Sequence, residues 1–152
     1  MNKATQEAIQ QWRAKAKSDW ITIEILLDSD RCPSDTVCFH CQQFVEKLLK
    51  GLLTLHNIEA PRTHDLRRLI ELSESYVPQL SSLKDHADIL TEHSVQSRYP
   101  DEWRKIETSE MNQMVQLAKE FRRFIIPHLK FKRAKPKARC SSKSNSHPKK
   151  KT

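Results

Sequence analysis

Polar side chains suited to binding a nucleotide recur at helical spacing between Phe39 and Lys50. Four of them follow one another at steps of three or four residues: His40, Gln43, Lys47 and Lys50. Side chains at these steps share one side of an α-helix. They could form a strip that meets a phosphate or a ribose. They could also form a bonded set in which His40 or Gln43 joins two helices and Glu46 pairs with Lys50, because buried polar groups usually satisfy one another. The two interpretations are compatible.

Further polar candidates stand where helices are expected to begin or end. His64 and Asp65 precede an apolar periodic segment, and the free amides of a helix N-terminus suit anions. Because Asp65 would oppose an anion, capping and packing are favoured for this pair. Arg98 and Tyr99 before a proline could clamp a base or phosphate, or could form a helix-ending turn. The candidate ligand-binding residues are therefore His40, Gln43, Lys47, His64, Arg98 and Tyr99.

Metal and nucleophile chemistry fit the sequence less well. Cys38 and Cys41 have a zinc-like spacing, with Cys32 and His40 nearby. On a helix, however, His40 points about 200° away from Cys38, so these ligands do not converge. No serine stands in the glycine-flanked turn that a serine nucleophile needs. We predict reduced thiols, no metal site, no cofactor and no assigned catalytic residue.

Five helical segments are needed to position these residues. Apolar residues recur at helical steps in 9–27, 37–55, 66–72, 80–95 and 111–129. Prolines 33, 61, 78 and 100 stand near the breaks between segments. The chain has one glycine, which excludes glycine-rich phosphate loops and makes hairpin-rich folds unfavourable. We predict an all-α, antiparallel up-and-down bundle of about five helices.

Local signals predict how three of these helices begin or end. Ser34 or Asp35 can cap the second helix, and the Thr63 hydroxyl can accept a bond from an amide two or three residues on. Asp65 would then lie in the first turn of the third helix, where a carboxylate is favoured. The last helix should begin near Ser109 and fray around Pro127.

The positive charge of the chain is concentrated at its C-terminal end. Ten of the 27 basic residues and no acidic residue lie in 130–152, which leaves 17 basic against 19 acidic residues in 1–129. Such a composition buries too little apolar surface to fold, so we predict a helical domain over 1–129 and a disordered Lys/Arg-rich tail over 130–152. The tail could hold a polyanion by charge alone, or could be a solubilising extension.

Three separated motifs resemble those of one known family. The second helical segment contains FHCQQFVEKLLK from Phe39 to Lys50, followed by THDL from Thr63 to Leu66 and RYP from Arg98 to Pro100. This ordered set resembles the HEPN domain family (higher eukaryotes and prokaryotes nucleotide-binding), over roughly residues 8–129. The resemblance implies a helical bundle that is commonly a homodimer and is often found with a minimal nucleotidyltransferase domain.

The resemblance implies one of two activities. Some members are metal-independent ribonucleases, often toxins of toxin–antitoxin pairs, with an Arg-x4-6-His motif near the start of the last helix; others bind nucleotides or RNA. Arg98 stands near the expected arginine, but Trp103, Arg104 and Lys105 occupy the histidine positions. Arg122 and Arg123 precede His128 at suitable spacing, at the wrong end of the last helix.

Three functions follow from these observations. The first is a nucleotide- or RNA-binding homodimeric module that acts alone or alongside a nucleotidyltransferase partner. The second is an endoribonuclease toxin with an unusual site that combines Arg98 with His40 or His64 across a dimer. The third is a dimerisation or scaffold module without a ligand. No apolar run reaches the roughly 20 residues of a membrane span, so we expect a cytoplasmic protein that does not enter the membrane.

Overall fold

The computed structural model describes residues 1–96 and 104–130. Five α-helices and one 3₁₀ segment occupy this part of the chain, without strands: α1 (Lys3–Leu27), α2 (Ser34–Leu55), α3 (Leu66–Ser73), η1 (Pro78–Leu83), α4 (Lys84–Gln96) and α5 (Thr108–Ile125). The predicted all-α bundle is confirmed. None of the described helices is long and apolar enough to cross a membrane.

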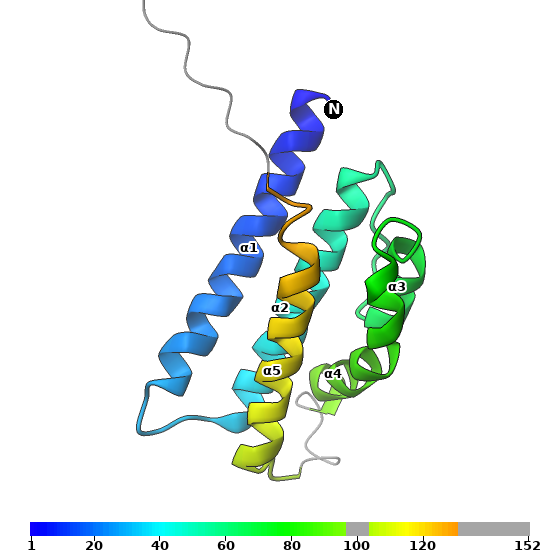
Figure 1. The fold of residues 1–152 in the computed structure, drawn as a ribbon. Helices are drawn as coiled ribbons and strands as arrows, with labels where there is room; N and C mark the ends of the chain where they lie inside the picture. Colours follow the sequence, from blue (N-terminus) through cyan, green and yellow to red (C-terminus); the bar gives the residue numbers. More distant parts are fainter. Residues whose placement is uncertain (97–103, 131–152) are drawn as a thin grey trace, which may run out of the picture.

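The helix α2 is the central element of the bundle. It contacts α1 and α5, which run beside it, and also α3 and α4 on its other side (Figure 1). The sequence explains this position, because apolar residues cover most of the circumference of α2 and are almost all buried. A helix with so wide an apolar surface must be surrounded by other elements. The remaining narrow sector of α2 is polar, and it contains the candidate residues.

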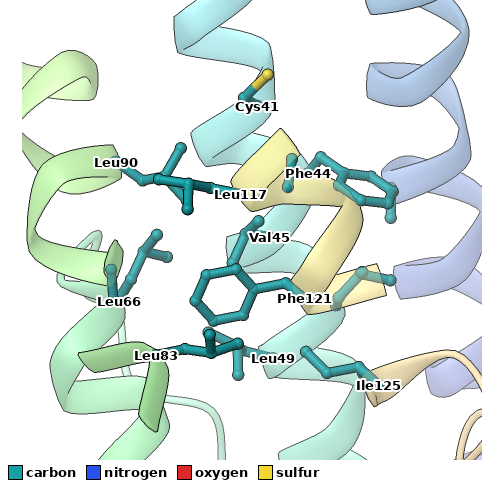
Figure 2. Packing of buried hydrophobic residues seen from close by; sticks show 14 of the residues in the cluster. Cys41, Phe44, Val45, Leu49, Leu66, Leu83, Leu90, Leu117, Phe121 and Ile125 are labelled. Atoms are coloured by element: carbon teal, nitrogen blue, oxygen red, sulfur yellow. The ribbon is translucent and has the colours of Figure 1, made fainter. Parts of the chain in front are cut away.

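The hydrophobic core fills the space between α2 and the helices around it. Phe121 and Ile125 of α5 reach toward Val45 and Leu49 of α2, and all four are fully buried (Figure 2). Leu90 of α4 belongs to the same cluster. Removing a core ring such as Phe121 typically costs about 3–5 kcal/mol. The core therefore fixes α2 firmly, and with it the direction of its polar sector.

The start of α2 differs from the prediction. Pro33 occupies the N-cap position in an extended conformation, and neither Ser34 nor Asp35 makes a side-chain cap bond. The Asp35 carboxylate instead accepts a bond from the adjacent Thr36 amide at 2.8 Å. The prediction of a Ser34 or Asp35 cap is wrong, because both residues already lie inside the helix that begins directly after the proline.

At the start of α3 the predicted Thr63 hydrogen bond is present, but the N-cap residue differs from the expected one. The Thr63 hydroxyl accepts a bond from the Asp65 amide at 3.1 Å, two residues on, as expected. The N-cap is Asp65, whose carboxylate accepts a bond from the Arg68 amide at 3.2 Å. Asp65 is thus the N-cap of α3, directly before the first turn in which the sequence placed it.

Two further predicted segments are refined by the structure. The fourth segment begins as the 3₁₀ element η1 at Pro78 and becomes α-helical at Lys84. The last helix ends at Ile125 and continues as turns to Leu129, which confirms the fraying predicted around Pro127. Arg98, Tyr99 and residues 131–152 lie outside the described residues, so the boundary of the tail and its disorder stay predictions.

Candidate functional site

The polar sector of α2 lies between α1 and the segment that leads into α3. We call it the polar strip, and it comprises His40, Gln43, Lys47 and Lys50 together with His64 from the α2–α3 connection. Two carboxylates that are almost fully buried organise the strip: Asp19 of α1, which is 6% exposed, and Glu46 of α2, which is 5% exposed. Every member of the strip connects to one of these two groups, directly or through one amide.

Asp19 holds the first half of the strip. Its Oδ1 lies 2.9 Å from His40 Nδ1, and its Oδ2 accepts a hydrogen bond from Lys47 Nζ. Since Asp19 belongs to α1 and its partners to α2, this cluster joins the two helices. The expected role of His40 in joining helices is confirmed. Lys47 and Asp19 thus form an ion pair that joins α1 to α2.

Glu46 holds the second half of the strip. Its Oε1 accepts a bond from Lys50 Nζ at 2.8 Å, which confirms the predicted i,i+4 pair. Its Oε2 lies 3.0 Å from His64 Nδ1 and accepts a bond from Gln42 Nε2 at 3.0 Å. Burial alone would raise the pKa of Glu46, but the hydrogen bonds from Lys50, His64 and Gln42 overcome this and hold the pKa below its ordinary value. Glu46 is therefore ionised at neutral pH.

Gln43 extends the Glu46 cluster along the surface. Its Nε2 donates to Gln42 Oε1 at 2.7 Å, while Gln42 Nε2 also donates to the backbone carbonyl of His64 at 3.2 Å. Gln43 therefore bonds to a neighbour on its own helix, and of the two residues expected to join helices, His40 or Gln43, the structure shows His40 in this role. Gln42, which the sequence does not single out, thus fastens the α2–α3 connection to α2 together with Glu46.

The paired arrangement limits the charge that the strip presents. The two lysines are balanced by the two carboxylates, so these four groups together carry no net charge. Each lysine ammonium has three donors, and each imidazole that is held at Nδ1 leaves Nε2 for another partner. Within the described residues, no protein group bonds to these Nε2 atoms. The strip can thus exchange hydrogen bonds with hydroxyls and base edges more readily than it can collect phosphates.

One part of the strip also has the geometry of a proton-transfer group. A carboxylate at Nδ1 orients an imidazole so that Nε2 can accept a proton, as in other histidine–carboxylate pairs. His40 is held in this way by Asp19, and Lys47 lies on the other oxygen of the same carboxylate. A base and a cation are therefore adjacent at the surface between α1 and α2.

A third polar cluster, which the sequence analysis did not identify, joins α4 to the start of α5. His93 is 3% exposed, and its Nε2 lies 3.2 Å from Glu110 Oε1. Arg104 Nη1 donates to Glu110 Oε2 at 2.8 Å. Burial lowers the pKa of His93, although Glu110 opposes this effect, so the imidazole is neutral. The cluster therefore fastens α4 to the start of α5.

The three cysteines in the described part of the chain, Cys32, Cys38 and Cys41, do not share a site with His40. Cys38 and Cys41 are buried free thiols, and burial raises the pKa of Cys38 to about 12 and that of Cys41 further still. Cys32 Sγ lies 3.7 Å from Met111 Sδ, while His40 turns to Asp19. In residues 1–96 and 104–130, no three histidine, cysteine or acidic residues are grouped so that they could hold a metal ion.

The arginines near the C-terminal end of α5 have separate partners. Arg122 lies over the Trp20 ring at 5.0 Å from its centroid, and Arg123 lies over the Phe124 ring at 4.7 Å. This arrangement gives no indication of a shared arginine–histidine site with His128.

Comparison with known proteins gives one family. Residues 9–130 match the family model of the HEPN domain. No curated protein and no solved structure matches the chain.

Proposed function

Because the chain belongs to the HEPN domain family, we propose that it is a nucleotide- or RNA-binding module rather than primarily an enzyme. The observation that supports this best is the organisation of the polar strip. Two buried carboxylates hold two lysines and two imidazoles in fixed positions while leaving donors and acceptors for a ligand. Such preorganisation lowers the entropy lost when a ligand binds.

The proposed contact residues are His40, Gln43, Lys47 and His64. The lysine Nζ would donate to a phosphate or a ribose, and the imidazole Nε2 atoms would accept from ribose hydroxyls or the base edge. Arg98 and Tyr99 of the RYP motif complete the proposed site and lie outside the described residues. This proposal requires no metal ion or other cofactor.

A homodimer and a nucleotidyltransferase-domain partner are part of the same proposal. Support for an interface comes from two exposed apolar side chains near the end of α1, Ile25 and Leu27, which do not line the hollow between α1 and α5. Ile25 is 64% exposed, and exposed apolar side chains that lie close together are typical of protein–protein contacts. Analytical ultracentrifugation of the full chain and of an Ile25→Lys variant tests the dimer; a wild-type monomer would contradict it.

The direct test is binding of ATP and of a mixed RNA pool to the full chain, with EDTA present. Lys47→Ala should weaken binding about tenfold, the loss expected for one charged hydrogen bond. Lys119→Ala is the matched control, because Lys119 is an exposed lysine on α5 away from the strip. A circular dichroism melt must show that both variants fold. Equal affinities of the two variants would contradict the strip as the binding site.

A metal-independent endoribonuclease is the second candidate, and the His40–Asp19 pair with adjacent Lys47 is the observation in its favour. His40 Nε2 would take the proton of a ribose 2′-hydroxyl as that oxygen attacks phosphorus, and Lys47 would stabilise the added negative charge. The bond from phosphorus to the 5′-oxygen would then break, leaving a 2′,3′-cyclic phosphate, and the departing 5′-oxygen would take the proton back from His40. Cleavage in EDTA that His40→Gln abolishes, with binding retained, would establish this activity. Binding without cleavage would favour the module, and neither would leave a dimerisation or scaffold protein.

A further inference from the structure

A second surface lies on the other side of the α1–α2 contact. Consecutive helical residues point about 100° apart, so Trp20 leaves α1 in a different direction from Asp19. Trp20 lines a hollow of about 970 Å³ between α1 and α5, and Phe44 and Leu48 of α2 also line it. We call this hollow the basic groove. It shares no lining residue with the polar strip.

The charges along the basic groove are strongly unbalanced. The groove is lined by four cations: Arg13 and Lys17 of α1, Arg122 of α5, and Lys130. Within the described residues, none of these four forms an ion pair with a carboxylate at 4.0 Å or less. The acidic lining residue is Glu24, whose Oε1 already accepts a bond from Trp20 Nε1 at 2.8 Å. The groove therefore presents positive charge that the protein itself does not neutralise.

An aromatic layer orients one of these cations. The Arg122 guanidinium lies 5.0 Å from the Trp20 ring centroid, and the Trp20 ring packs on Phe44 at 4.9 Å between centroids. Trp20 is almost fully buried, so its ring is not available to a base. A guanidinium held flat on a ring can itself bind a phosphate or stack on a base.

The shape of the groove favours an extended ligand. The residues of α1 that line it run from Gln6 to Glu24, which corresponds to about 27 Å of helix. Two glutamines, Gln6 and Gln10, add amide groups that can bond to hydroxyls or base edges. The positively charged C-terminal sequence would be repelled from such a groove, and a second copy of the chain placed there would bring like charges together.

From this charge complementarity, we propose that the basic groove binds the phosphate backbone of a single-stranded nucleic acid. The inference rests on the proposed function and adds a binding surface distinct from the polar strip. Arg13, Lys17, Arg122 and Lys130 contact phosphates, and the floor of the groove contributes apolar contact with sugars.

The experiment compares two triple variants of the full chain that lose the same charge. The groove variant is Arg13→Gln/Lys17→Gln/Arg122→Gln, and the control is Arg31→Gln/Arg62→Gln/Lys119→Gln, at exposed positions that do not line the groove. Fluorescence anisotropy measures binding of a labelled 20-residue oligouridine and of the corresponding deoxyoligonucleotide at several salt concentrations. Melts check folding, and Lys17→Gln/Lys130→Gln repeats the test without disturbing the Trp20 stack.

The groove variant should bind about tenfold more weakly than the control, and its plot of log K against log salt should be shallower by about 2, since each phosphate contact contributes about 0.7. A loss on either oligonucleotide supports the groove and identifies the sugar it accepts. Equal affinities of groove and control variants, with wild-type binding intact, overturn the groove alone. No binding of RNA, DNA or ATP by the wild type overturns the groove and the proposed function together.

Discussion

The polar strip and the basic groove use similar side chains in opposite electrostatic settings. Both are bordered by α1 and α2, and both contain cations at helical spacing. In the strip, Asp19 and Glu46 neutralise the lysines, whereas the groove cations have no such partners within the described residues. The comparison teaches that a count of basic residues does not give the charge available to a ligand. That charge depends on whether buried carboxylates pair with the basic side chains.

The largest expected effect comes from removing a carboxylate of the strip. Glu46→Ala leaves the Lys50 ammonium, whose side chain is 10% exposed, without its partner. Breaking such a buried pair should lower the free energy of unfolding by about 3–5 kcal/mol, measured by urea denaturation. Glu7→Ala is the control, because Glu7 pairs with Lys3 at the surface and should change stability by less than about 1 kcal/mol.

A double substitution sharpens this prediction. Glu46→Leu/Lys50→Met removes both charges together, so it should recover most of the stability that Glu46→Ala loses. If Glu46→Ala were no more damaging than Glu7→Ala, the strip would not be held by its carboxylates.

The next effect is a dependence of stability on pH. The pKa of Glu46 lies below its ordinary value of 4.5 in the folded chain, so its contribution is present above pH 4.5 and is lost as pH falls through the lower folded pKa. The pKa of His93 lies below 6.5 because of burial, so protonation opposes folding below that pH in the same direction. Urea midpoints should begin to fall as pH is lowered below 6.5 and should fall further below pH 4.5, and His93→Gln should flatten the part that begins at pH 6.5. A midpoint that rises on acidification would contradict both assignments.

A smaller effect is expected from the groove cation that stacks on an aromatic ring. Arg122→Ala removes the contact with Trp20 and should cost about 0.5–1 kcal/mol in urea denaturation. Arg122→Lys should retain part of this contact, because an ammonium is also attracted to the ring face. A loss as large as that of Glu46→Ala would show that Arg122 is structural like the strip residues.

The smallest effect is expected at Lys17. Because Lys17 is exposed among like charges, Lys17→Gln should leave stability at low salt unchanged or raise it by a few tenths of a kcal/mol. The gain should vanish at high salt, where such repulsion is screened. Destabilisation by Lys17→Gln at low salt would indicate that this cation has a partner and that the contrast with the strip is weaker.

The sequence is sufficient to predict the helices and the contacts between residues that are close together in the chain. The periodic apolar residues predict each helix, and the four-residue spacing of Glu46 and Lys50 predicts their pair. The Asp19–His40 and Glu46–His64 contacts join residues 21 and 18 positions apart, so they depend on how the helices pack. The basic groove escapes prediction for the same reason, because its two sides come from opposite ends of the bundle sequence.

Among the described elements, the helix α1 packs principally against α2, and this affects both surfaces. A helix attached mainly through one neighbour can open as a local unit, which backbone amide hydrogen exchange reports. A nucleic-acid strand bound across the groove would connect α1 to α5 as well. It would slow amide hydrogen exchange along α1 in proportion to the fraction of protein that has the strand bound. Since Asp19 lies on this helix, occupancy of the groove would restrict the motion of His40 and Lys47 without any change in their mean positions.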